Sequence, residues 1–279
     1  MPEPDGAPAS APRPPGAVPA PPARAEVLGV PLAISSYDEV LDWMDATVAC
    51  GARGSITAAA VNLLICARDE PATMQAVRDL TLAVPDGQPL VWSLRALGHT
   101  RATRVYGPEL MLRWCARAAG SGTPAYLYGG RDDRARALLE RRLSERFPAL
   151  RIAGGCSPRF RPIGEPPLTP SERERVIADI DCSGAQVVWV GTGQPRQELW
   201  MSEMRPLLKA PLLVGVGAAF DFHAGLVSQA PAWMGDHGLE WLYRLSREPR
   251  RLWRRYLLGN PRFLAAFACQ YARSVSERR

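Results

Sequence analysis

The chain has 279 residues, of which 47% are hydrophobic and 22% are charged, as in a globular protein with room for one α/β domain and an appendage. Three histidines and six scattered cysteines without a CxxC pair argue against a metal centre or a disulfide scaffold and favour the reduced thiols of the cytosol. No apolar run approaches the roughly 18–20 residues that span a membrane, and the N-terminus lacks the apolar core of a signal peptide.

Composition divides the chain into three parts. Residues 1–24 are rich in proline and alanine without a hydrophobic period, which predicts a disordered tail. In residues 25–230 apolar strands alternate with helical segments, which predicts a doubly wound, Rossmann-like, mostly parallel α/β sheet. Residues 231–279 are expected to form a basic helical appendage with breaks near Pro249 and Pro261.

Six strands and six helices are expected in the α/β part, together with a proline-rich loop over Pro158–Pro170. The expected strands are Ser55–Ala60, Leu80–Val84, Pro124–Tyr128, Leu150–Ala153, Val187–Val190 and Leu212–Gly215. The expected helices lie near Tyr37–Ala49, Pro89–Leu97, Pro108–Ala118, Asp132–Arg146, Ser171–Asp181 and Gln197–Leu207.

The most informative turn follows the expected strand Val187–Val190. Gly191 and Gly193 allow a tight turn and a close approach to a ligand, and Pro195 suits the first turn of the next helix. Free backbone N–H groups at such a helix start favour an anion, typically phosphate. The polar residues Gln194–Glu198 favour a binding role over a purely structural turn, which the glycines alone would also allow.

Three further turns follow expected strands, at the edge where open α/β sheets bind ligands. One contains Asp86, one the pair Gly129–Gly130, and one Gly217 with Asp221 shortly after it. Together they imply a composite nucleotide pocket. Neither glycine-rich turn continues to a full GxGxxG, which argues against a simple NAD-type dehydrogenase.

Six motifs follow one another over roughly residues 27–258: PDGQPLVW, RVYGPELM, YLYGG, VGTGQPRQE, VGVGAAFDFHAG and QAPAWM…GLEWLYRLSREPRRLWRRY. Together and in this order they resemble the WecG/TagA/CpsF glycosyltransferases, glycosyltransferase family 26. The resemblance implies transfer of a sugar, often of the N-acetylmannosamine type, from a UDP donor to a polyprenyl-diphosphate-linked sugar. It also implies inversion at the anomeric carbon, no metal or other cofactor, and a C-terminal appendage that meets the membrane.

The resemblance also assigns roles to single residues. The catalytic base falls on Asp86, and a carboxylate suits an inverting transfer because it can take the proton of the acceptor hydroxyl. Arg104 matches an arginine that faces the diphosphate, Gln197 a sugar or phosphate contact, and Asp221 a contact to the nucleoside. The residue types alone also allow a favoured Asp-Gly turn, a surface arginine, a polar helix residue and a helix cap.

One departure concerns the donor sugar. The family often has a Thr-x-Asn pair on the first strand, and spacing back from Asp86 places that pair on Ala58 and Ala60. Alanine cannot supply the side-chain hydrogen bonds. Thr57 or Asn62 is a candidate substitute, although Asn62 also fits a surface helix.

The segment from Gly238 carries ten arginines against three glutamates, a net charge of +7. Arginines interleaved with tryptophan and tyrosine suit an anionic membrane surface, while a solvated basic face over core tryptophans remains the alternative. By the resemblance, Arg244, Arg251 and Arg254 lie near the lipid diphosphate. No nucleic-acid motif accompanies the charge.

The sequence therefore predicts an inverting, metal-free hexosyltransferase of bacterial surface-glycan synthesis. It would act in the cytoplasm, on the inner face of the cell membrane, with a UDP-sugar and a polyprenyl-diphosphate-linked saccharide as substrates. Alternatives are a non-catalytic, membrane-peripheral nucleotide-binding protein and a Rossmann-type oxidoreductase. A homo-oligomer is left open, and so are the donor sugar, the acceptor sugar and the linkage.

Overall fold

The computed structural model describes residues 20–162 and 164–277. Most of the proline-rich segment expected to be a disordered tail, residues 1–19, lies outside the described residues. The first described strand begins at Arg24, one residue before the expected start of the folded domain.

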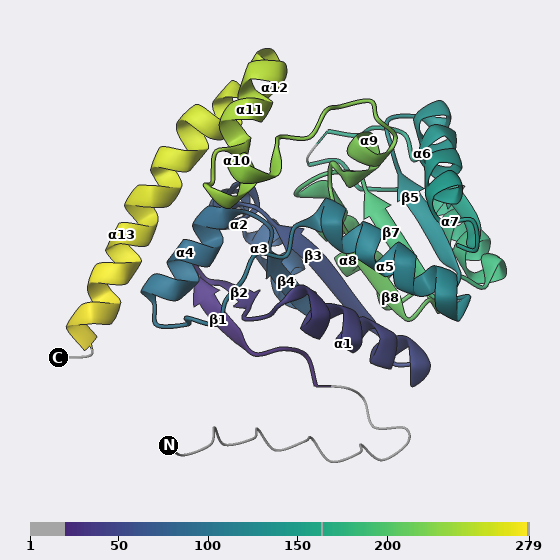
Figure 1. The fold of residues 1–279 in the computed structure, drawn as a ribbon, viewed down its shortest axis with the longest axis horizontal. Coiled ribbons are helices and arrows are strands. Elements are labelled where there is room, and N and C mark those ends of the chain that lie inside the picture. The colour runs from purple at the N-terminus through teal and green to yellow at the C-terminus, as the bar shows by residue number, and fades with distance from the viewer. Residues whose placement is uncertain (1–19, 163, 278–279) are drawn as a thin grey trace, which may run out of the picture.

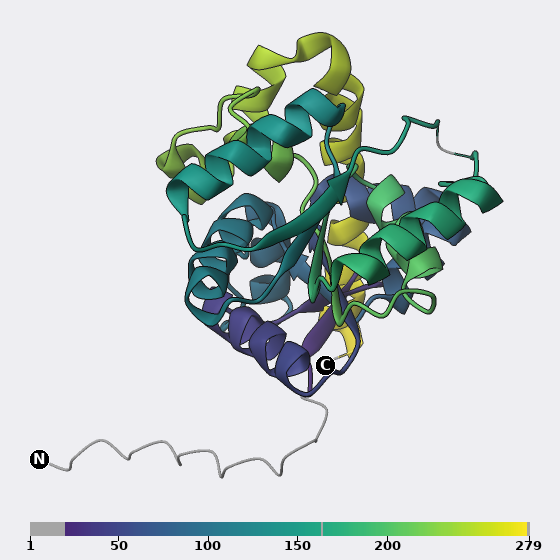
Figure 2. The same cartoon turned by 90° about the vertical axis from the view of Figure 1, so that its right-hand side faces the viewer.

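The core is an eight-stranded sheet with the order β1-β2-β4-β3-β8-β7-β5-β6. The first two strands pair antiparallel, and every other neighbouring pair is parallel. Helices cover both faces of the sheet (Figures 1 and 2), which confirms the predicted doubly wound α/β fold. The strands are β1 (Arg24–Val27), β2 (Val30–Ala33), β3 (Gly54–Ala59), β4 (Leu82–Pro85), β5 (Ala125–Gly129), β6 (Ile152–Cys156), β7 (Val187–Gly191) and β8 (Leu212–Gly215).

All six expected strands and all six expected helices are present, with ends shifted by at most three residues. The strands β1 and β2 and the helices α2, α3 and α9 were not expected. The helices of the α/β part are α1 (Tyr37–Ala49), α2 (Val61–Asp69), α3 (Pro71–Asp79), α4 (Gln88–Ala96), α5 (Gly107–Ser121), α6 (Asp133–Arg146), α7 (Pro170–Ser183), α8 (Arg196–Met204) and α9 (Ala219–His223).

Local sequence explains where several helices begin. Ser36 and Glu39 form a reciprocal capping box at the start of α1, because each side chain bonds a backbone N–H of the other. Thr169 and Glu172 form the same box at the start of α7. Pro195 takes the N-cap position of α8, one residue before the first helical turn in which it was expected.

Beyond α9 the described chain is helical, as expected. The predicted break at Pro249 is confirmed, whereas the break predicted near Pro261 is wrong. Pro261 is the third residue of α13, which continues the π-helical turn η1 without an interruption, so the proline is accommodated inside a continuous helical run. The elements are α10 (Ala232–Asp236), α11 (Glu240–Arg247), α12 (Pro249–Trp253), the π-helical turn η1 (Arg254–Leu258) and α13 (Gly259–Glu277).

The long helix α13 runs along the outside of the α/β core, beside α2 (Figure 1). Phe263 is only 2% exposed and packs in the same apolar cluster as Val27 and Leu63. The amide of Gln270 binds the backbone of the β1–β2 hairpin, and Arg262 pairs with Asp69 of α2 at 2.6 Å. The end of the appendage is therefore part of the hydrophobic core rather than a loosely attached tail.

Candidate active site

A cleft of about 620 Å³ opens at the carboxyl ends of the parallel strands. The turns after β3, β4, β7 and β8 line it, together with the loop before α7 and with side chains from the appendage. This is the edge at which open α/β sheets bind ligands. Of the residues predicted from sequence, the cleft brings together Asn62, Asp86, Gly130, Gly191, Gly193, Gly217, Asp221, Arg244 and Arg251.

Asp86 follows β4 directly, and hydrogen bonds hold both its carboxylate and its backbone in place. Its Oδ1 accepts a hydrogen bond from the backbone N–H of Gly107 at 2.6 Å, and its own N–H donates to the carbonyl of Ala59. A Cβ on Gly107 would lie 2.9 Å from the Cβ of Ala58, so only glycine allows this approach. Burial raises the pKa of Asp86 to about 6, against the opposing effect of the Arg104 charge. A carboxylate with such a pKa is suited to general-base catalysis near neutral pH.

Arg104 lies beside Asp86 but outside the wall of the main cleft. It lines a smaller adjoining cavity of about 90 Å³. Its Nε donates to the carbonyl of Asp86 at 2.5 Å, and its other end forms an ion pair with Glu240 of α11. The guanidinium also stacks over the ring of Tyr106 at 4.3 Å. The anion that Arg104 contacts is therefore Glu240 of the appendage. The resemblance, in contrast, implies that this arginine faces a diphosphate.

Two of the predicted glycines, Gly129 and Gly191, allow neighbouring parts of the chain to pack closely beside the cleft. Gly129 has φ +132°, and a Cβ there would lie 2.6 Å from the backbone of Gly191. A Cβ on Gly191 would lie 2.5 Å from the ring of Phe220. The ends of β5 and β7 can thus lie side by side only with glycine at position 129, and Phe220 of α9 can pack onto the end of β7 only with glycine at position 191. Gly129 itself packs behind the cleft rather than lining it.

Gln197 does not face the cleft, in contrast to its predicted role as a sugar or phosphate contact. It is fully buried, and its Oε1 accepts the backbone N–H of Gly217 at 2.9 Å. Its Nε2 donates to Glu198 at 2.8 Å and to Thr57 at 3.3 Å. Because both ends of the amide are engaged, Gln197 fixes the glycine turn after β8 instead of binding a ligand itself.

Glu198 completes this buried network. Its Oε1 accepts the hydroxyl of Thr57 at 2.5 Å, while its Oε2 is buried without a hydrogen-bond partner. Burial raises the pKa of Glu198 to about 7. Thr57 consequently points away from the cleft and is not the substitute for the missing Thr-x-Asn pair. The network ties β3, α8 and the turn after β8 into one unit.

Thr192 lines the cleft although the sequence did not single it out, whereas Gln194 belongs to the polar stretch Gln194–Glu198 that favoured a binding role. Thr192 Oγ1 and Gln194 Oε1 are buried without a protein partner, although both residues line the cleft. The Nε2 of Gln194 donates to the carbonyl of Ala58 at 2.6 Å. Unpartnered polar atoms in a cleft wall are suited to a polar ligand. Asp221 lies nearby and pairs with Arg131 at 3.0 Å.

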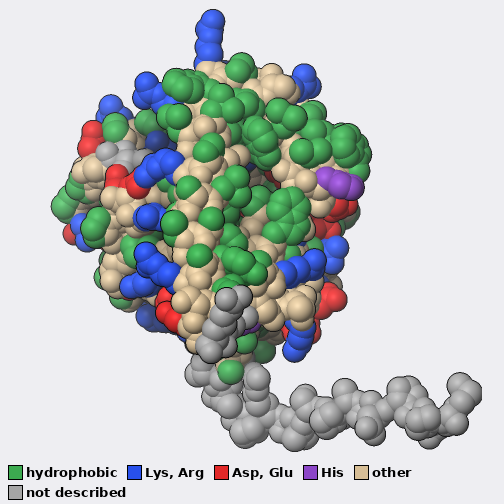
Figure 3. All heavy atoms as spheres, turned by 90° about the vertical axis from the view of Figure 1, so that its left-hand side faces the viewer, with side chains coloured by type: hydrophobic (Ala, Val, Ile, Leu, Met, Phe, Trp, Pro, Cys, Tyr) green, Lys and Arg blue, Asp and Glu red, His purple; other side chains and the backbone are tan. Residues whose placement is uncertain are grey.

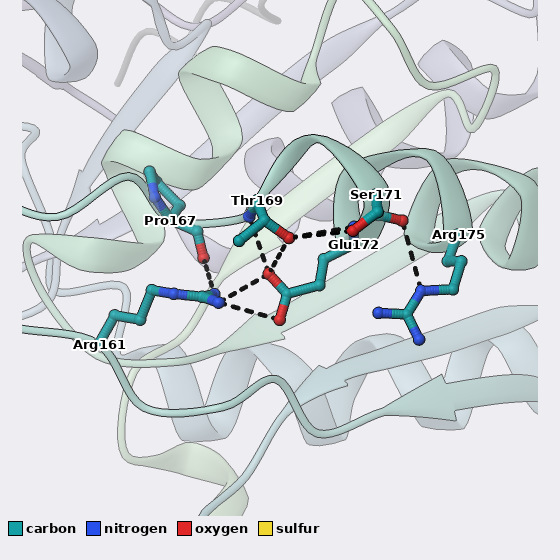
Figure 4. A network of polar contacts seen from close by, with 6 residues as sticks. All are labelled: Arg161, Pro167, Thr169, Ser171, Glu172 and Arg175. Carbon is teal, nitrogen blue, oxygen red and sulfur yellow. Dashed lines mark hydrogen bonds and ion pairs between the residues drawn. The ribbon is translucent and has the colours of Figure 1, made fainter.

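The proline-rich loop after β6 forms one rim of the cleft and presents an apolar ring. Figure 4 shows how it is anchored: Arg161 donates to the carbonyl of Pro167 at 3.0 Å and to both oxygens of Glu172 at 2.9 and 2.7 Å. The ring of Phe160 is 71% exposed, and the guanidinium of Arg196 lies 4.2 Å from its centroid. A fixed loop with an exposed aromatic ring provides a stacking surface for a planar group.

The wall beside Asp86 contains little that can form hydrogen bonds. Ala58 and Ala60 line it where the family often has the polar pair. Asn62, the other predicted substitute, does reach the cleft, and its Nδ2 donates weakly to Cys66 Sγ at 3.6 Å.

The appendage contributes its arginines differently from the sequence prediction. Arg244 and Arg251 line the cleft, whereas Arg254 is exposed and stacks over Trp253 at 5.2 Å. Arg255 lines the cleft instead. These residues lie at the junction of α12 with η1, whose wider π-helical winding changes the face on which successive side chains lie, so that Arg255 rather than Arg254 reaches the cleft.

The outer side of the appendage is rich in large apolar side chains. Figure 3 looks onto this face and shows hydrophobic side chains spread between arginines. Among the described residues, no helix is both long and apolar enough to cross a bilayer, and no group of three potential metal-ligating side chains comes together. The exposed apolar residues include Trp233, Leu242, Trp253, Leu257, Leu258, Leu264 and Tyr271.

Comparison with known families identifies the protein family to which the chain belongs. The sequence model described as "Glycosyl transferase WecG/TagA/CpsF family" matches residues 25–277. The chain belongs to this family. The resemblance seen in the motifs is confirmed and extends over nearly the whole described chain.

Membership makes the protein a glycosyltransferase of cell-surface glycan synthesis, which uses a nucleotide-sugar donor and a lipid-linked acceptor. The alternatives of a Rossmann-type oxidoreductase and of a non-catalytic nucleotide-binding protein are set aside. In this glycosyltransferase the glycine turns, Asp86 and the appendage arginines border one cleft, so the donor and the acceptor can meet there.

Proposed function

We propose that this glycosyltransferase moves a sugar, an N-acetylhexosamine or a related sugar, from a UDP donor to a polyprenyl-diphosphate-linked saccharide, with inversion at the anomeric carbon. The observation that carries the proposal is Asp86, a carboxylate at the centre of a cleft lined by glycine turns, with a pKa of about 6. An inverting transfer needs such a base and no covalent intermediate.

In the proposed reaction Asp86 removes the proton of the acceptor hydroxyl while that oxygen attacks C1 of the donor sugar. The bond from C1 to the diphosphate breaks on the opposite face of the sugar, and UDP leaves with the electron pair. The hydrogen bond from Gly107 to Oδ1 leaves Oδ2 of the carboxylate to take the proton. The proton ends on Asp86 and returns to solvent.

The nucleotide side of the cleft is proposed to hold UDP. The turn at Gly191–Gly193 would offer backbone N–H groups to phosphate oxygens, and Arg131 and Arg196 add positive charge on the same side of the cleft, while the N–H of Gly217 is already bound to Gln197. Phe160, backed by Arg196, is placed to stack on the uracil ring. Asp221 would accept a hydrogen bond from the uracil or the ribose, as expected from the sequence.

Two predicted catalytic residues are proposed to act by positioning. Arg104 holds the Asp86 carbonyl and fastens Glu240 of the appendage beside it. Gln197 holds the N–H of Gly217 and so shapes the turn after β8. Neither needs to touch the substrate to affect the rate, because displacing catalytic groups slightly is enough to slow a reaction.

The appendage is proposed to lie on the inner face of the cell membrane. Its exposed tryptophans and leucines would enter the interface, and exposed arginines would meet anionic lipid headgroups. Arg251 at the cleft and Arg254 beside it would then face the lipid diphosphate of the acceptor. Arg251 forms an ion pair with Glu248 at 2.6 Å, which holds it at the cleft.

The experiment that tests the function is incubation of the full chain with UDP-sugars and a polyprenyl-diphosphate-linked acceptor, with the anomeric configuration of the product read by NMR. Release of UDP together with an inverted linkage supports the proposal. Retention of configuration, or turnover only with a nucleotide other than UDP, contradicts it. Asp86→Asn serves as the inactive control.

A further inference from the structure

The backbone that holds the Asp86 carboxylate is itself held by a tyrosine hydroxyl. The N–H of Gly107 donates to Oδ1 of Asp86 at 2.6 Å. The preceding N–H, that of Tyr106, donates to the phenol oxygen of Tyr37 at 2.9 Å. Tyr106 is the N-cap of α5 and Gly107 its first residue, so Tyr37 binds the chain one peptide away from the bond to Asp86.

The hydroxyl of Tyr37 has a fixed position. Tyr37 is the first residue of α1, whose start is set by a capping box, and α1 lies beside α5 (Figure 1). The guanidinium of Arg113 lies 4.2 Å from the centroid of its ring. A second hydrogen bond joins the same two parts of the chain, because Oγ1 of Thr103 donates to the carbonyl of Ser35 at 2.8 Å.

The segment that leads into α5 binds the turn after β4 at alternate residues. The N–H groups of Val105 and Gly107 both donate to that turn. Tyr106 between them has an extended backbone, in which successive N–H groups point to opposite sides, and its N–H reaches Tyr37. Tyr37 therefore supplies the opposing hydrogen bond, which keeps the N–H of Gly107 directed at the carboxylate.

Tyr37 does not reach the space where a substrate would bind. It lines neither the main cleft nor the smaller cavity. Burial raises the pKa of its phenol to about 12, so the hydroxyl stays neutral near pH 7. It is therefore placed to act on Asp86 through the backbone rather than on a substrate.

We propose that Tyr37 is a positioning residue for Asp86: its hydroxyl holds the peptide of Tyr106, so that the next N–H donates to Oδ1 and leaves Oδ2 to take the acceptor proton. The inference rests on the proposed function, since it assumes that Asp86 is the base. It deepens that function by naming a residue outside the cleft on which the protonation of the base depends.

The proposal gives a direction for the pH dependence. Burial raises the pKa of Asp86, the charge of Arg104 lowers it, Glu240 raises it, and the hydrogen bond from Gly107 lowers it. That hydrogen bond favours the ionised carboxylate, so weakening it raises the pKa. Removing a neutral hydroxyl leaves the charge states of the other groups near Asp86, on α11, η1 and the start of α5, unchanged: Arg244, Arg255 and Tyr106.

The test compares Tyr37→Phe, which removes the phenol oxygen and keeps the ring, with Tyr126→Phe as the matched control. Tyr126 lies on β5 and lines neither space, and its hydroxyl donates to Asp179 of α7. The control thus also loses a tyrosine hydrogen bond, but far along the sheet from Asp86.

The measured quantity is the pH at which kcat/KM reaches half of its plateau, with the UDP-sugar that the wild type uses best and a soluble acceptor analogue. We expect this midpoint to be the same for the wild type and Tyr126→Phe. For Tyr37→Phe it should lie about half a pH unit higher, which corresponds to a roughly threefold loss of rate at pH 5. An unchanged midpoint in Tyr37→Phe overturns the inference, even if its rate is lower at every pH, and so does an equal shift in Tyr126→Phe.

Calorimetry with UDP provides a second readout. The dissociation constant for UDP should be the same for Tyr37→Phe and the wild type, because Tyr37 lines neither space. A loss of UDP affinity as large as the loss of rate would show that Tyr37 supports the nucleotide site, and the inference would be wrong.

Combining Tyr37→Phe with Asp86→Asn tests whether the tyrosine acts through the base. Without a carboxylate to hold, Tyr37→Phe should change the residual rate at pH 5 by less than roughly twofold. The same loss in both backgrounds overturns the inference. If Asp86→Asn is as active as the wild type, the proposed base fails as well; if Asp86→Asn is inactive and Tyr37→Phe keeps the wild-type midpoint, only the positioning role is wrong.

Thermal unfolding shows whether Tyr37→Phe is folded. Thr103→Val is the second variant, because it removes the other hydrogen bond between this segment and the residues before α1 without a change in charge. It should raise the midpoint in the same direction by a smaller amount. If Tyr37→Phe does not fold, Thr103→Val decides, and a midpoint equal to that of the wild type overturns the inference.

Discussion

Arg104 of the α/β core and Glu240 of the appendage form an ion pair directly beside Asp86, with each side chain less than one-fifth exposed. The same arginine donates its Nε to the Asp86 carbonyl. Asp86, the proposed base, and the appendage therefore share one anchor, so a change in the position of the appendage is expected to disturb the turn that carries Asp86. The pair gives a physical reason why the basic segment would matter for the proposed catalysis as well as for the proposed membrane contact.

This anchor leads to the first prediction, made for Arg104→Gln, Glu240→Gln and the double variant. Each single change leaves a partly buried charge without its partner and is expected to lower the free energy of unfolding by about 1–3 kcal/mol. The double variant should be less destabilised than the sum of the two, because neither charge is then left alone. Chemical denaturation of the three variants measures this coupling, and strictly additive losses would show that the pair contributes nothing.

The second prediction concerns the base. Asp86→Asn keeps the size of the side chain and its hydrogen bond from Gly107, but removes the proton acceptor. Transfer is expected to fall by about 10²–10⁴-fold while the dissociation constant for UDP stays nearly unchanged. Initial rates test the loss of transfer, and UDP calorimetry on the same preparation tests whether the dissociation constant is unchanged. Turnover close to the wild type would remove Asp86 as the base.

The pH dependence of transfer follows from the pKa of about 6 for Asp86. Only the ionised carboxylate can accept the proton, so kcat/KM should rise with pH below about 6 and level off above it. A kcat/KM profile from pH 5 to 8 with a soluble acceptor analogue measures this rise and the plateau above it. A rate that falls with rising pH across this range would contradict a carboxylate base.

Glu198 is predicted to make the folded state less stable as pH rises, which is the opposite of the effect of most carboxylates in proteins. Burial raises its pKa from 4.5 to about 7, so the folded state holds its proton more tightly than the unfolded state does. Its contribution to stability is present below about pH 4.5 and is lost as pH rises to about 7. Glu198→Gln mimics the protonated acid and keeps the bond to Thr57, so it should be more stable than the wild type at pH 8, on the order of 1–3 kcal/mol.

Thermal unfolding of both proteins at pH 5 and pH 8 measures this effect. The difference between the two should be small at pH 5 and larger at pH 8. If Glu198→Gln is destabilised equally at both values, the carboxyl is not protonated in the folded state. Glu203→Gln, a partly exposed carboxylate on the same helix, provides the control.

Much of the fold could be predicted from the sequence because its signals are local. Apolar runs such as Val187–Val190 predicted six of the eight strands of the sheet. The strands β1 and β2 were missed because neither contains an apolar run: β1 includes Arg24 and Glu26, and β2 is interrupted by Pro31. The helix α2 was missed because the Ala-rich end of β3 runs into it without a side-chain cap.

The site was predicted less completely, because side-chain direction is a tertiary property. Sequence placed Asp86 and the glycine turns at one edge, and the cleft unites nearly all of them. It could not show that Gln197 turns inward to Gly217, or that Arg104 meets a glutamate 136 residues away. The resemblance pointed to Arg254, whereas Arg255 lines the cleft, because no local signal in the sequence marks the π-helical turn that brings it there.

The fifth prediction concerns metal removal. The cleft offers arginines and backbone N–H groups to the leaving diphosphate, so transfer is expected to be independent of a divalent ion. Rates after dialysis against EDTA should match those of the untreated protein. Loss of activity that magnesium or manganese restores would overturn this expectation.

The last prediction concerns the membrane. Deleting the appendage would not test its role cleanly, because Phe263 belongs to the core and its removal would expose Val27 and Leu63. Charge reversal at the exposed Arg250 and Arg254 leaves that packing intact. A basic segment gains on the order of 1 kcal/mol per arginine at an anionic surface, and salt screens the gain. Arg250→Glu with Arg254→Glu should therefore weaken binding to vesicles that contain anionic lipid by at least roughly tenfold at low salt.

The control is Arg151→Glu, which reverses an exposed charge just before β6, at the edge of the sheet opposite the cleft. It should bind vesicles as the wild type does. Transfer to the lipid-linked acceptor should fall together with vesicle binding in the double variant, whereas UDP binding should not change, because neither arginine has been placed at the nucleotide side. Co-sedimentation at low and high salt provides the measurement. Equal binding of all three proteins, or binding that salt does not weaken, would show that the basic face of the appendage does not contact the membrane.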